Sequence, residues 1–358
     1  MDSITQAMLG ASIGGAMLGR WHGRKALVAG ALLGTLPDMD VVINYGDAVA
    51  NMTYHRGFSH SLLVLTALSL LLAWLCWRWR PHADYSATRL GLCIWLILVT
   101  HVTLDAFTSY GTQLFWPLTT PPVAISSIFI IDPLYSVPLL LAVISGLIIG
   151  LKGKGLSLQY AALTVSTLYL ASTLVGKQMA GNNLQLALER DGIEPQAVFV
   201  SPTPFNTVLW RVVAVDGDDY YEGLVSWLDS QPPVLERLPR RYSEAASALA
   251  GSEQHARLRW FTRDILRYDL IDQQWVVTDL RLGMTGYHPF RFALAEIDPD
   301  SQSTQLIDNV VAWPSGPRDF SLLTELRERA LDSSYRLSLQ ELTRDLGRSP
   351  VALGHTAP

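Results

Sequence analysis

Charged residues are scarce in this sequence. Asp, Glu, Lys and Arg make up 16% of the 358 residues, whereas about a quarter is usual for a soluble globular protein. Hydrophobic residues make up 49%, and their excess lies almost wholly before residue 176. The shortage of charge therefore excludes an ordinary soluble protein for the first half and predicts membrane-spanning helices there.

Cysteine and basic charge are also scarce. The two cysteines, Cys76 and Cys93, lie in or beside apolar runs, so a disulfide framework is not indicated. The net charge of -5 gives no reason to expect a nucleic-acid partner. The first apolar run lacks a basic start and Asp2 is acidic, so we expect no cleavable signal peptide.

Six apolar runs predict about six membrane spans, of which the first is the shortest and the second is interrupted by Pro37-Asp38-Met39-Asp40. A spanning helix needs about 20 apolar residues. Small residues are frequent in the first run, and they let helices approach closely in a membrane. The runs are Ile4–Gly19, Ala26–Ile43, Phe58–Trp77, Leu90–Phe107, Ile128–Leu151 and Leu156–Val175.

Basic residues fall in alternate connections between these runs. Short basic loops stay on the cytoplasmic side of a membrane. Six spans would then place both termini and the C-terminal half on the outer side of the membrane. The basic residues that follow the first, third and fifth runs are Arg20, Arg24, Lys25, Arg78, Arg80, Arg89, Lys152 and Lys154.

Residue types that bind metals recur at the ends of the runs, all on the predicted outer side. His101 and Asp105 are four positions apart, so they share one face of a helix. Imidazole and carboxylate groups suit zinc, and also manganese or iron. Together the seven residues predict a metal or catalytic site. They are Asp38, Asp40, His55, His60, His101, Asp105 and Asp132.

Each of these residues also has a simpler interpretation. Asp38 follows Pro37 and can end a helix, and Asp132 precedes Pro133 at a turn. A single histidine near the headgroups of a membrane is commonly just a polar residue. Beside the histidines, Ser59 is predicted to cap the next helix, and Arg56 is suited to bind an anionic oxygen.

The motifs around these residues resemble the YdjM/YfhP-type family of membrane-bound metal-dependent hydrolases. The resemblance covers about residues 1–180 and implies an inner-membrane protein with several spans and a metal site. Many members have Thr-His where this chain has Thr5-Gln6, so one ligand is missing or replaced. The motifs are Leu36–Asp40, His55–Ser61, His101–Asp105 with Thr108 and Gly111, and Asp132–Pro133.

A fainter similarity concerns the order of the ligands along the chain. The order Asp, His, His, Asp is similar to that of zinc-dependent phospholipases C and single-strand nucleases. It implies a first coordination shell of Asp40, His55, His101 and Asp105 and favours phosphoester chemistry. Asp38, His60 and Asp132 are then predicted to lie in an outer shell or to bind a second ion.

The composition changes after Lys177. Alternating short strands, turn residues and polar helices predict a soluble α+β domain over residues 179–347, after a membrane domain over residues 1–178. Residues 348–358 are predicted to form a disordered tail. The predicted strands cover residues 197–200, 207–215, 220–227, 258–268, 275–282 and 290–297.

The first functional interpretation is an integral-membrane metal-dependent hydrolase. Metal-activated water would attack an ester or phosphoester of a lipid or lipid-linked substrate. Asp38 is the candidate general base, and Arg56 the candidate for stabilising the developing oxyanion. One alternative is a non-enzymatic protein that binds metal for structure, sensing or transport, and another is a scaffold whose outer domain binds a partner. The sequence leaves the substrate, the metal and the oligomeric state open.

Overall fold

The computed structural model describes residues 1–315 and 320–349, which divide into two compact units. The predicted disordered tail lies outside the described residues from residue 350 onward. Unit 1 comprises Met1–Ile43, His55–Val175 and Pro204–Asn206. Unit 2 comprises Asn44–Tyr54, Gly176–Thr203 and the described residues from Thr207 onward.

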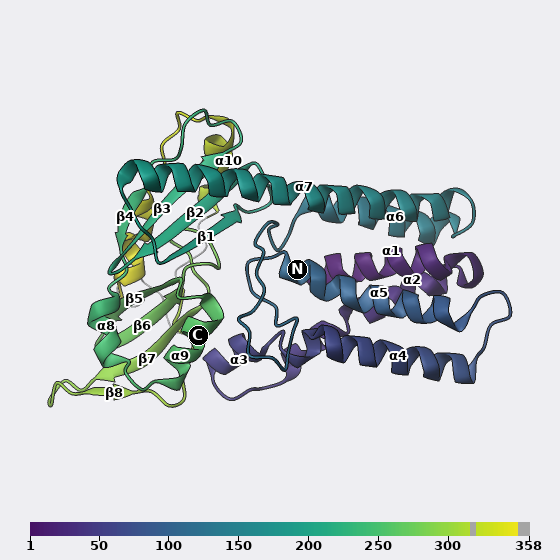
Figure 1. The fold of residues 1–358 in the computed structure, drawn as a ribbon, viewed down its shortest axis with the longest axis horizontal. Coiled ribbons are helices and arrows are strands. Elements are labelled where there is room, and N and C mark those ends of the chain that lie inside the picture. Colours follow the sequence, from purple (N-terminus) through teal and green to yellow (C-terminus); the bar gives the residue numbers. More distant parts are fainter. Residues whose placement is uncertain (316–319, 350–358) are drawn as a thin grey trace. The chain divides into compact units, whose positions relative to one another are not determined.

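Unit 1 is a bundle of helices (Figure 1). Its interior is apolar: Leu98, Val102, Ile128 and Leu139 are fully buried. The elements are α1 (Ser3–His22), α2 (Arg24–Thr35), η1 (Pro37–Val42), η2 (Phe58–His60), α4 (Leu62–Trp79), α5 (Ala87–Ala106), α6 (Pro133–Ile149) and the first part of α7 (Lys154–Asp191).

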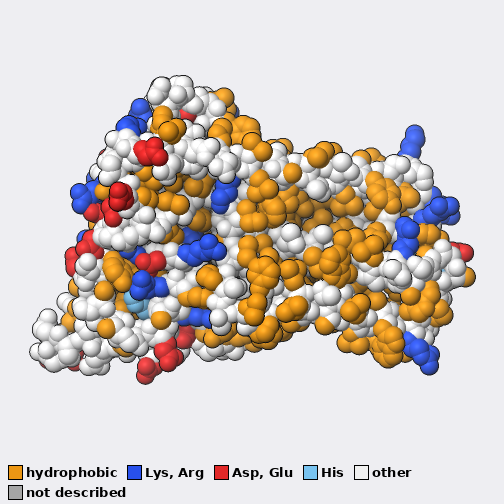
Figure 2. All heavy atoms as spheres, viewed as in Figure 1, with side chains coloured by type: hydrophobic (Ala, Val, Ile, Leu, Met, Phe, Trp, Pro, Cys, Tyr) orange, Lys and Arg blue, Asp and Glu red, His pale blue; other side chains and the backbone are white. Residues whose placement is uncertain are grey.

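Three of the described helices, α4, α5 and α7, are long and apolar enough to cross a membrane, and α6 is a shorter apolar helix. The expectation of about six spans is therefore not supported. The second predicted span ends as a helix at Thr35, because Pro37 opens a separate 3-10 turn. The sixth continues without a break to Asp191, so α7 extends well beyond the predicted end at Val175. Hydrophobic side chains cover much of the helical surface in Figure 2.

The three basic connections lie at one end of unit 1. Figure 1 places the α1–α2, α4–α5 and α6–α7 connections together, and Figure 2 shows Lys and Arg side chains gathered there. The C-terminal end of α5 lies at the other end. The turn η1 contacts α5 and η2, and η2 precedes and contacts α4. The predicted site residues on these three elements therefore belong to the end opposite the basic loops.

Glycines bring α1 and α2 into close contact. A Cβ atom at Gly30 would lie 2.2 Å from the carbonyl oxygen of Gly10, and one at Gly34 would lie 2.7 Å from that of Gln6. These distances leave no room for a side chain, so the two backbones can approach only because both positions are glycine. The contact fixes the C-terminal end of α2, and with it the start of η1, against α1.

Unit 2 contains two antiparallel four-stranded sheets in which each strand pairs with the next along the chain. The first consists of β1 (Ala197–Pro202), β2 (Leu209–Asp216), β3 (Asp219–Ser226) and β4 (Glu236–Pro239). The second consists of β5 (Leu266–Ile271), β6 (Gln274–Asp279), β7 (Arg291–Ile297) and β8 (Thr304–Leu306). The helices are α3 (Ala48–Tyr54), the end of α7, α8 (Tyr242–Ala248), α9 (Glu253–Thr262), α10 (Ser321–Leu331), α11 (Leu339–Thr343) and η3 (Arg344–Gly347).

One predicted strand, residues 258–268, is wrong in its first half. The structure has α9 up to Thr262 and only then β5. The hydroxyl of Ser252 accepts a hydrogen bond from the backbone N–H of His255 and caps α9. Leu258 and Phe261, three positions apart, are both buried. That spacing is helical rather than alternating, and the cap upstream identifies where the helix begins.

A short segment of the N-terminal half belongs to unit 2. The helix α3 packs against α9, where the guanidinium group of Arg257 lies 4.2 Å from the ring centroid of Tyr54. The same group donates a hydrogen bond to the carbonyl oxygen of Thr53 at 3.2 Å. The chain therefore leaves unit 1 after Ile43 and re-enters it at His55.

Candidate metal centre

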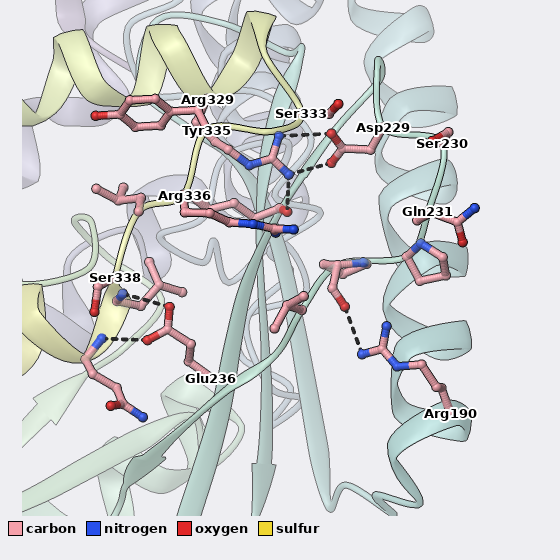
Figure 3. A pocket seen from close by; sticks show the side chains of 17 residues that line it. Arg190, Asp229, Ser230, Gln231, Glu236, Arg329, Ser333, Tyr335, Arg336 and Ser338 are labelled. Carbon is pink, nitrogen blue, oxygen red and sulfur yellow. Dashed lines mark hydrogen bonds and ion pairs between the residues drawn. The ribbon is translucent and has the colours of Figure 1, made fainter.

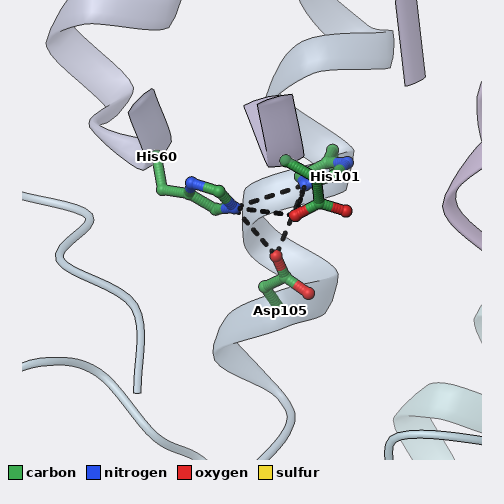
Figure 4. Close-up of side chains that lie close together, drawn as sticks. His60, His101 and Asp105 are labelled. Atoms are coloured by element: carbon green, nitrogen blue, oxygen red, sulfur yellow. Dashed lines mark hydrogen bonds and ion pairs between the residues drawn. The ribbon is translucent and has the colours of Figure 1, made fainter. Parts of the chain in front are cut away.

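Four side chains that can ligate a metal converge in unit 1. Asp38, His60, His101 and Asp105 each offer one ligand atom, and these atoms all lie within 4.8 Å of one another. We call these four residues the ligand group. Figure 4 shows His60, His101 and Asp105 directed toward one another. His60, His101 and Asp105 are buried, whereas the side chain of Asp38 is 17% exposed.

Hydrogen bonds orient both imidazole rings of the ligand group. His101 Nδ1 lies 2.6 Å from the carbonyl oxygen of Gly34, which can only accept, so Nδ1 carries the hydrogen. The Ser59 hydroxyl donates to Asp40 Oδ2 at 2.6 Å and lies 2.9 Å from His60 Nδ1. Because its one hydrogen is used on Asp40, the hydroxyl accepts from His60 Nδ1. With Nδ1 as the protonated nitrogen, each ring directs Nε2 into the group, where its lone pair can bind a metal ion.

The spacing of the ligand atoms suits a small ion. His60 Nε2 lies 3.1 Å from Asp105 Oδ2 and 3.4 Å from Asp38 Oδ1. His101 Nε2 lies 3.4 Å from each of Asp38 Oδ1, Asp105 Oδ2 and His60 Nε2. These are five of the six distances among the ligand atoms, and the sixth, between the carboxylate oxygens of Asp38 and Asp105, lies within 4.8 Å. Ligand atoms of a tetrahedral zinc ion with bonds of about 2.0 Å lie about 3.3 Å apart, which the first five distances match. Two imidazole lone pairs and two carboxylates this close repel one another unless a metal ion or a proton lies between them.

The other oxygen of Asp105 is held from three directions. Asp105 Oδ1 is contacted by the amino group of Met1, by Gln6 Nε2 at 3.1 Å and by Arg56 Nη2 at 3.4 Å. Gln6 Nε2 also donates to the carbonyl oxygen of His101 at 3.1 Å. Gln6 therefore directs a donor at two residues of the group and holds Asp105 in place. The sequence marked Gln6 only as a departure from the family motif.

Arg56 lies beside the ligand group in an unusual conformation. Its φ angle is 61°, in the left-handed region that few non-glycine residues adopt. Its backbone N–H donates to Asp40 Oδ2 at 3.0 Å, and its guanidinium carbon lies 5.0 Å from the ring centroid of Tyr110. The residue is 5% exposed, and its Nε and Nη1 atoms have no hydrogen-bond partner in the described residues.

The ligand group differs from the predicted first shell of Asp40, His55, His101 and Asp105. The structure brings Asp38 and His60 to His101 and Asp105 instead. The carboxylate of Asp40 is occupied elsewhere: Oδ2 accepts from Arg56 and Ser59, and Oδ1 lies 2.9 Å from Nδ1 of His55. Asp40 and His55 therefore form a separate pair next to the ligand group.

Asp132 is not a member of the ligand group. Its carboxylate caps α6, since Oδ1 accepts from the backbone N–H groups of Leu134 and Tyr135. The Tyr169 hydroxyl donates to Oδ2 at 2.8 Å. The simpler interpretation of this residue, a turn before Pro133, thus describes its contacts. The predicted cap at Ser59 is corrected as well, because Ser61 caps α4.

Unit 2 has a polar cleft of about 960 Å³ (Figure 3). Its acidic groups are satisfied locally. Asp229 pairs with Arg329 at 2.6 Å, and Glu236 accepts from the backbone N–H groups of Leu339 and Gln340. Arg190 donates to the carbonyl oxygen of Pro233. These contacts describe a structural arrangement and point to no particular ligand.

Comparison with known proteins agrees with the motifs. Residues 1–180 match a family described as YdjM inner membrane protein. The chain belongs to the YdjM family. This match confirms the resemblance to the YdjM family that the motifs indicated. The matched residues of this chain, 1–180, contain the whole ligand group.

Two curated proteins are similar to this YdjM-family chain. The uncharacterized protein YfhP of Bacillus subtilis (strain 168) is 28% identical over 315 residues, which cover 81% of this chain and 89% of YfhP. The inner membrane protein YbcI of Escherichia coli (strain K12) is 34% identical over 93 residues, which cover 26% of this chain and 52% of YbcI. No solved structure matches the chain. The similarity to YfhP is longer than the family region, so it extends into unit 2.

Proposed function

We propose that this YdjM-family chain is an integral-membrane metal-dependent hydrolase that acts on an ester or phosphoester of a lipid or lipid-linked substrate. The ligand group carries the proposal: four ligand atoms lie within 4.8 Å, and hydrogen bonds aim both imidazoles at the same point. The group lies at an end of apolar helices, which favours a substrate that resides in the membrane.

Zinc is the ion that we propose for the ligand group. Two histidines and two carboxylates at tetrahedral spacing suit zinc, although manganese and iron use the same ligand types. When bound, such an ion acts as a Lewis acid on a substrate oxygen and makes water more acidic. Asp38 is the exposed member of the group, so substrate and water would enter on its side.

The pair of His55 and Asp40 is the proposed general base. An imidazole held by a carboxylate is a common arrangement for proton transfer, and the two groups are 2.9 Å apart. His55 is 22% exposed and its ring centroid lies 6.1 Å from that of His60. This assignment replaces the predicted role of Asp38, whose Oδ1 faces the ligand group.

We further propose that the end with the basic loops faces the cytoplasm and that the ligand group and unit 2 face the periplasm. Positive charge in short loops supports this orientation. Alkaline phosphatase fused after residue 180 should be active, and the same reporter in the loop between Arg78 and Arg89 should be inactive. The reverse pattern would show that the orientation is inverted.

One observation favours a second function, in which the metal ion has a structural role. Four protein ligands complete the coordination of a tetrahedral zinc ion, as in structural sites, whereas catalytic sites keep one position open. In that case the ion would stabilise the fold, and the protein would bind metal without hydrolysing a substrate. A catalytic ion would need five-coordinate geometry or one of the four residues outside its first shell.

Metal analysis separates these possibilities. Purified protein should contain one divalent ion per chain, and His101→Ala should lose it. His82→Ala, at the basic end of unit 1, is the matched control and should retain the ion. Chelation should abolish hydrolysis in a screen of ester and phosphoester lipids but leave thermal unfolding in detergent nearly unchanged. If chelation unfolds unit 1 and the metal-loaded protein hydrolyses nothing, the metal has a structural role and the proposed hydrolase activity is wrong.

A further inference from the structure

We propose that Arg56, together with an ion in the ligand group, forms a subsite for a phosphate group, so that the substrate is a phosphoester. This inference rests on the proposed function and narrows its substrate class. It comes from a guanidinium group that is buried beside the ligand group with part of its hydrogen-bonding capacity unused.

The unused donors of Arg56 are the first observation. The residue is 5% exposed, and neither Nε nor Nη1 has a partner in the part of the chain that the structure describes. Buried polar groups are nearly always paired, so two unmatched donors on one buried side chain indicate a missing acceptor. The planar guanidinium fork fits two oxygens of a phosphate or carboxylate.

The position of Arg56 is fixed by its surroundings. Its backbone N–H donates to Asp40, its carbonyl oxygen accepts from the backbone N–H of Gln113 at 3.0 Å, and its guanidinium group lies near the ring of Tyr110. Holding a non-glycine residue at a φ angle of 61° costs free energy. The fold therefore holds the guanidinium group in one place before any ligand arrives, and little entropy is lost on binding.

Charge balance identifies the ligand class. A divalent ion would neutralise Asp38 and Asp105, the two acidic members of the ligand group. Arg56 Nη2 lies 3.4 Å from Asp105, so it would lose the countercharge of that carboxylate. A phosphoester already carries negative charge before reaction, whereas a carboxylic ester is neutral. Of these two substrate classes, only the phosphoester therefore carries a negative charge that can pair with Arg56 before the reaction begins.

This arrangement makes the two ligands interdependent. An ion strengthens phosphate binding by releasing Arg56 from Asp105, and phosphate must strengthen ion binding by the same factor. Inorganic phosphate is a suitable probe, and its binding to the full chain in detergent can be measured by calorimetry with and without zinc. We expect binding to the zinc-loaded protein only.

Substitutions of Arg56 test the subsite. Arg56→Gln should weaken phosphate binding by at least about tenfold while zinc stays at one ion per chain, and Arg56→Lys should give an intermediate loss because the charge remains without the fork. Arg89→Gln is the matched control: Arg89 lies near the other end of α5 and its guanidinium carbon lies 4.7 Å from the ring centroid of Trp21. Its phosphate affinity should equal that of the wild type.

Vesicles identify the source of the phosphate group. Phosphatidylcholine vesicles with and without phosphatidic acid should be compared as competitors of inorganic phosphate. Displacement only by vesicles with phosphatidic acid supports a lipid phosphomonoester, displacement by both vesicles supports a lipid phosphodiester, and no displacement supports a soluble phosphoester. Equal phosphate affinity in zinc-loaded wild type and Arg56→Gln overturns the subsite alone. A wild type that binds no zinc overturns the proposed function, and with it this subsite.

Discussion

The two units bury charge in opposite ways. Unit 2 pairs each of several buried arginines with a carboxylate: Arg211 with Glu222 at 2.5 Å, Arg267 with Asp269 at 2.8 Å, Arg281 with Asp279 at 2.7 Å and Arg329 with Asp229 at 2.6 Å. Unit 1 instead gathers two carboxylates and two imidazoles around one point, with Arg56 beside them. The side chains of the unit 2 pairs have no unmatched buried polar atom, whereas Asp38 Oδ1 and Arg56 Nε and Nη1 in unit 1 have no hydrogen-bond partner in the described residues.

This difference indicates that the buried charges of unit 2 stabilise the fold, whereas those of the ligand group in unit 1 serve to bind an ion. A buried pair satisfies both partners, so removing one partner leaves an uncompensated charge and destabilises the fold. The ligand group keeps polar atoms unmatched, and a bound cation would lower its free energy. We therefore expect mutations of the buried pairs in unit 2 to change stability and mutations of the ligand group to change metal affinity.

The largest effect is expected at the Arg211–Glu222 pair. Glu222→Gln should destabilise unit 2 by about 3–5 kcal/mol, because the fully buried Arg211 loses its countercharge. Hydrogen exchange of β2 and β3 in the full chain measures it. The contrasting variant is Asp38→Asn, which should weaken zinc binding but change the stability of the metal-free protein by less than about 1 kcal/mol. Equal destabilisation by both variants would abolish the distinction between the units.

A smaller effect is expected from the contact between α1 and α2. Gly30→Ala places a Cβ atom 2.2 Å from the carbonyl oxygen of Gly10, so the helices must separate at a cost of about 1–3 kcal/mol. Zinc affinity should fall too, because the separation moves the Gly34 carbonyl oxygen away from His101. The control is Gly91→Ala, whose Cβ would lie 3.5 Å from that of Ala73 in an ordinary contact. Unchanged zinc affinity in Gly30→Ala would contradict the role of this packing.

An effect of pH is expected in unit 2. Burial, helped by Arg259, lowers the pKa of His255 to about 4, against about 6.5 in the unfolded chain. The unfolded state therefore binds the proton first as the pH falls. The free energy of unfolding should therefore decrease as the pH falls from about 6.5 to about 4. The expected loss is about 2 kcal/mol after allowance for screening by solvent.

Hydrogen exchange of β5 at pH 7 and pH 5 checks this expectation. In the variant His255→Gln, the part of the pH dependence that comes from this residue should disappear. An identical pH dependence in the variant and the wild type would show that another group is responsible.

The smallest effect is expected where the chain passes between the units. Arg257→Gln loosens α3 from α9, and α3 directly precedes His55 and Arg56. We expect zinc affinity to fall a few-fold, about 1 kcal/mol or less, because the segment before these residues becomes more mobile. Arg259→Gln is the control, since Arg259 lies on the same helix but pairs with Asp264 at 2.7 Å. Equal zinc affinity in both variants would mean that α3 does not support the site.

Two of the predicted spans match helices that are long and apolar enough to cross a membrane. The runs that became α4 and α5 begin and end within four residues of those helices. The first two runs were less informative, because their small residues reflect helix packing as much as membrane insertion. In the second half, α9 was interpreted as strand because a ten-residue helix and a strand can both carry buried aromatic and aliphatic residues.

The sequence by itself determined that His101 and Asp105 lie on one face of a helix, because four residues along a helix always return to the same face. It also predicted that residues of ligand type gather at the ends of the apolar runs. Tertiary structure alone decided which of them join the pair. Asp38 and Asp40 lie on one 3-10 turn, and the hydrogen bonds from Arg56 and Ser59 draw Asp40 away from the ligand group. Those bonds connect segments sixteen and nineteen residues apart, and no local periodicity specifies such contacts.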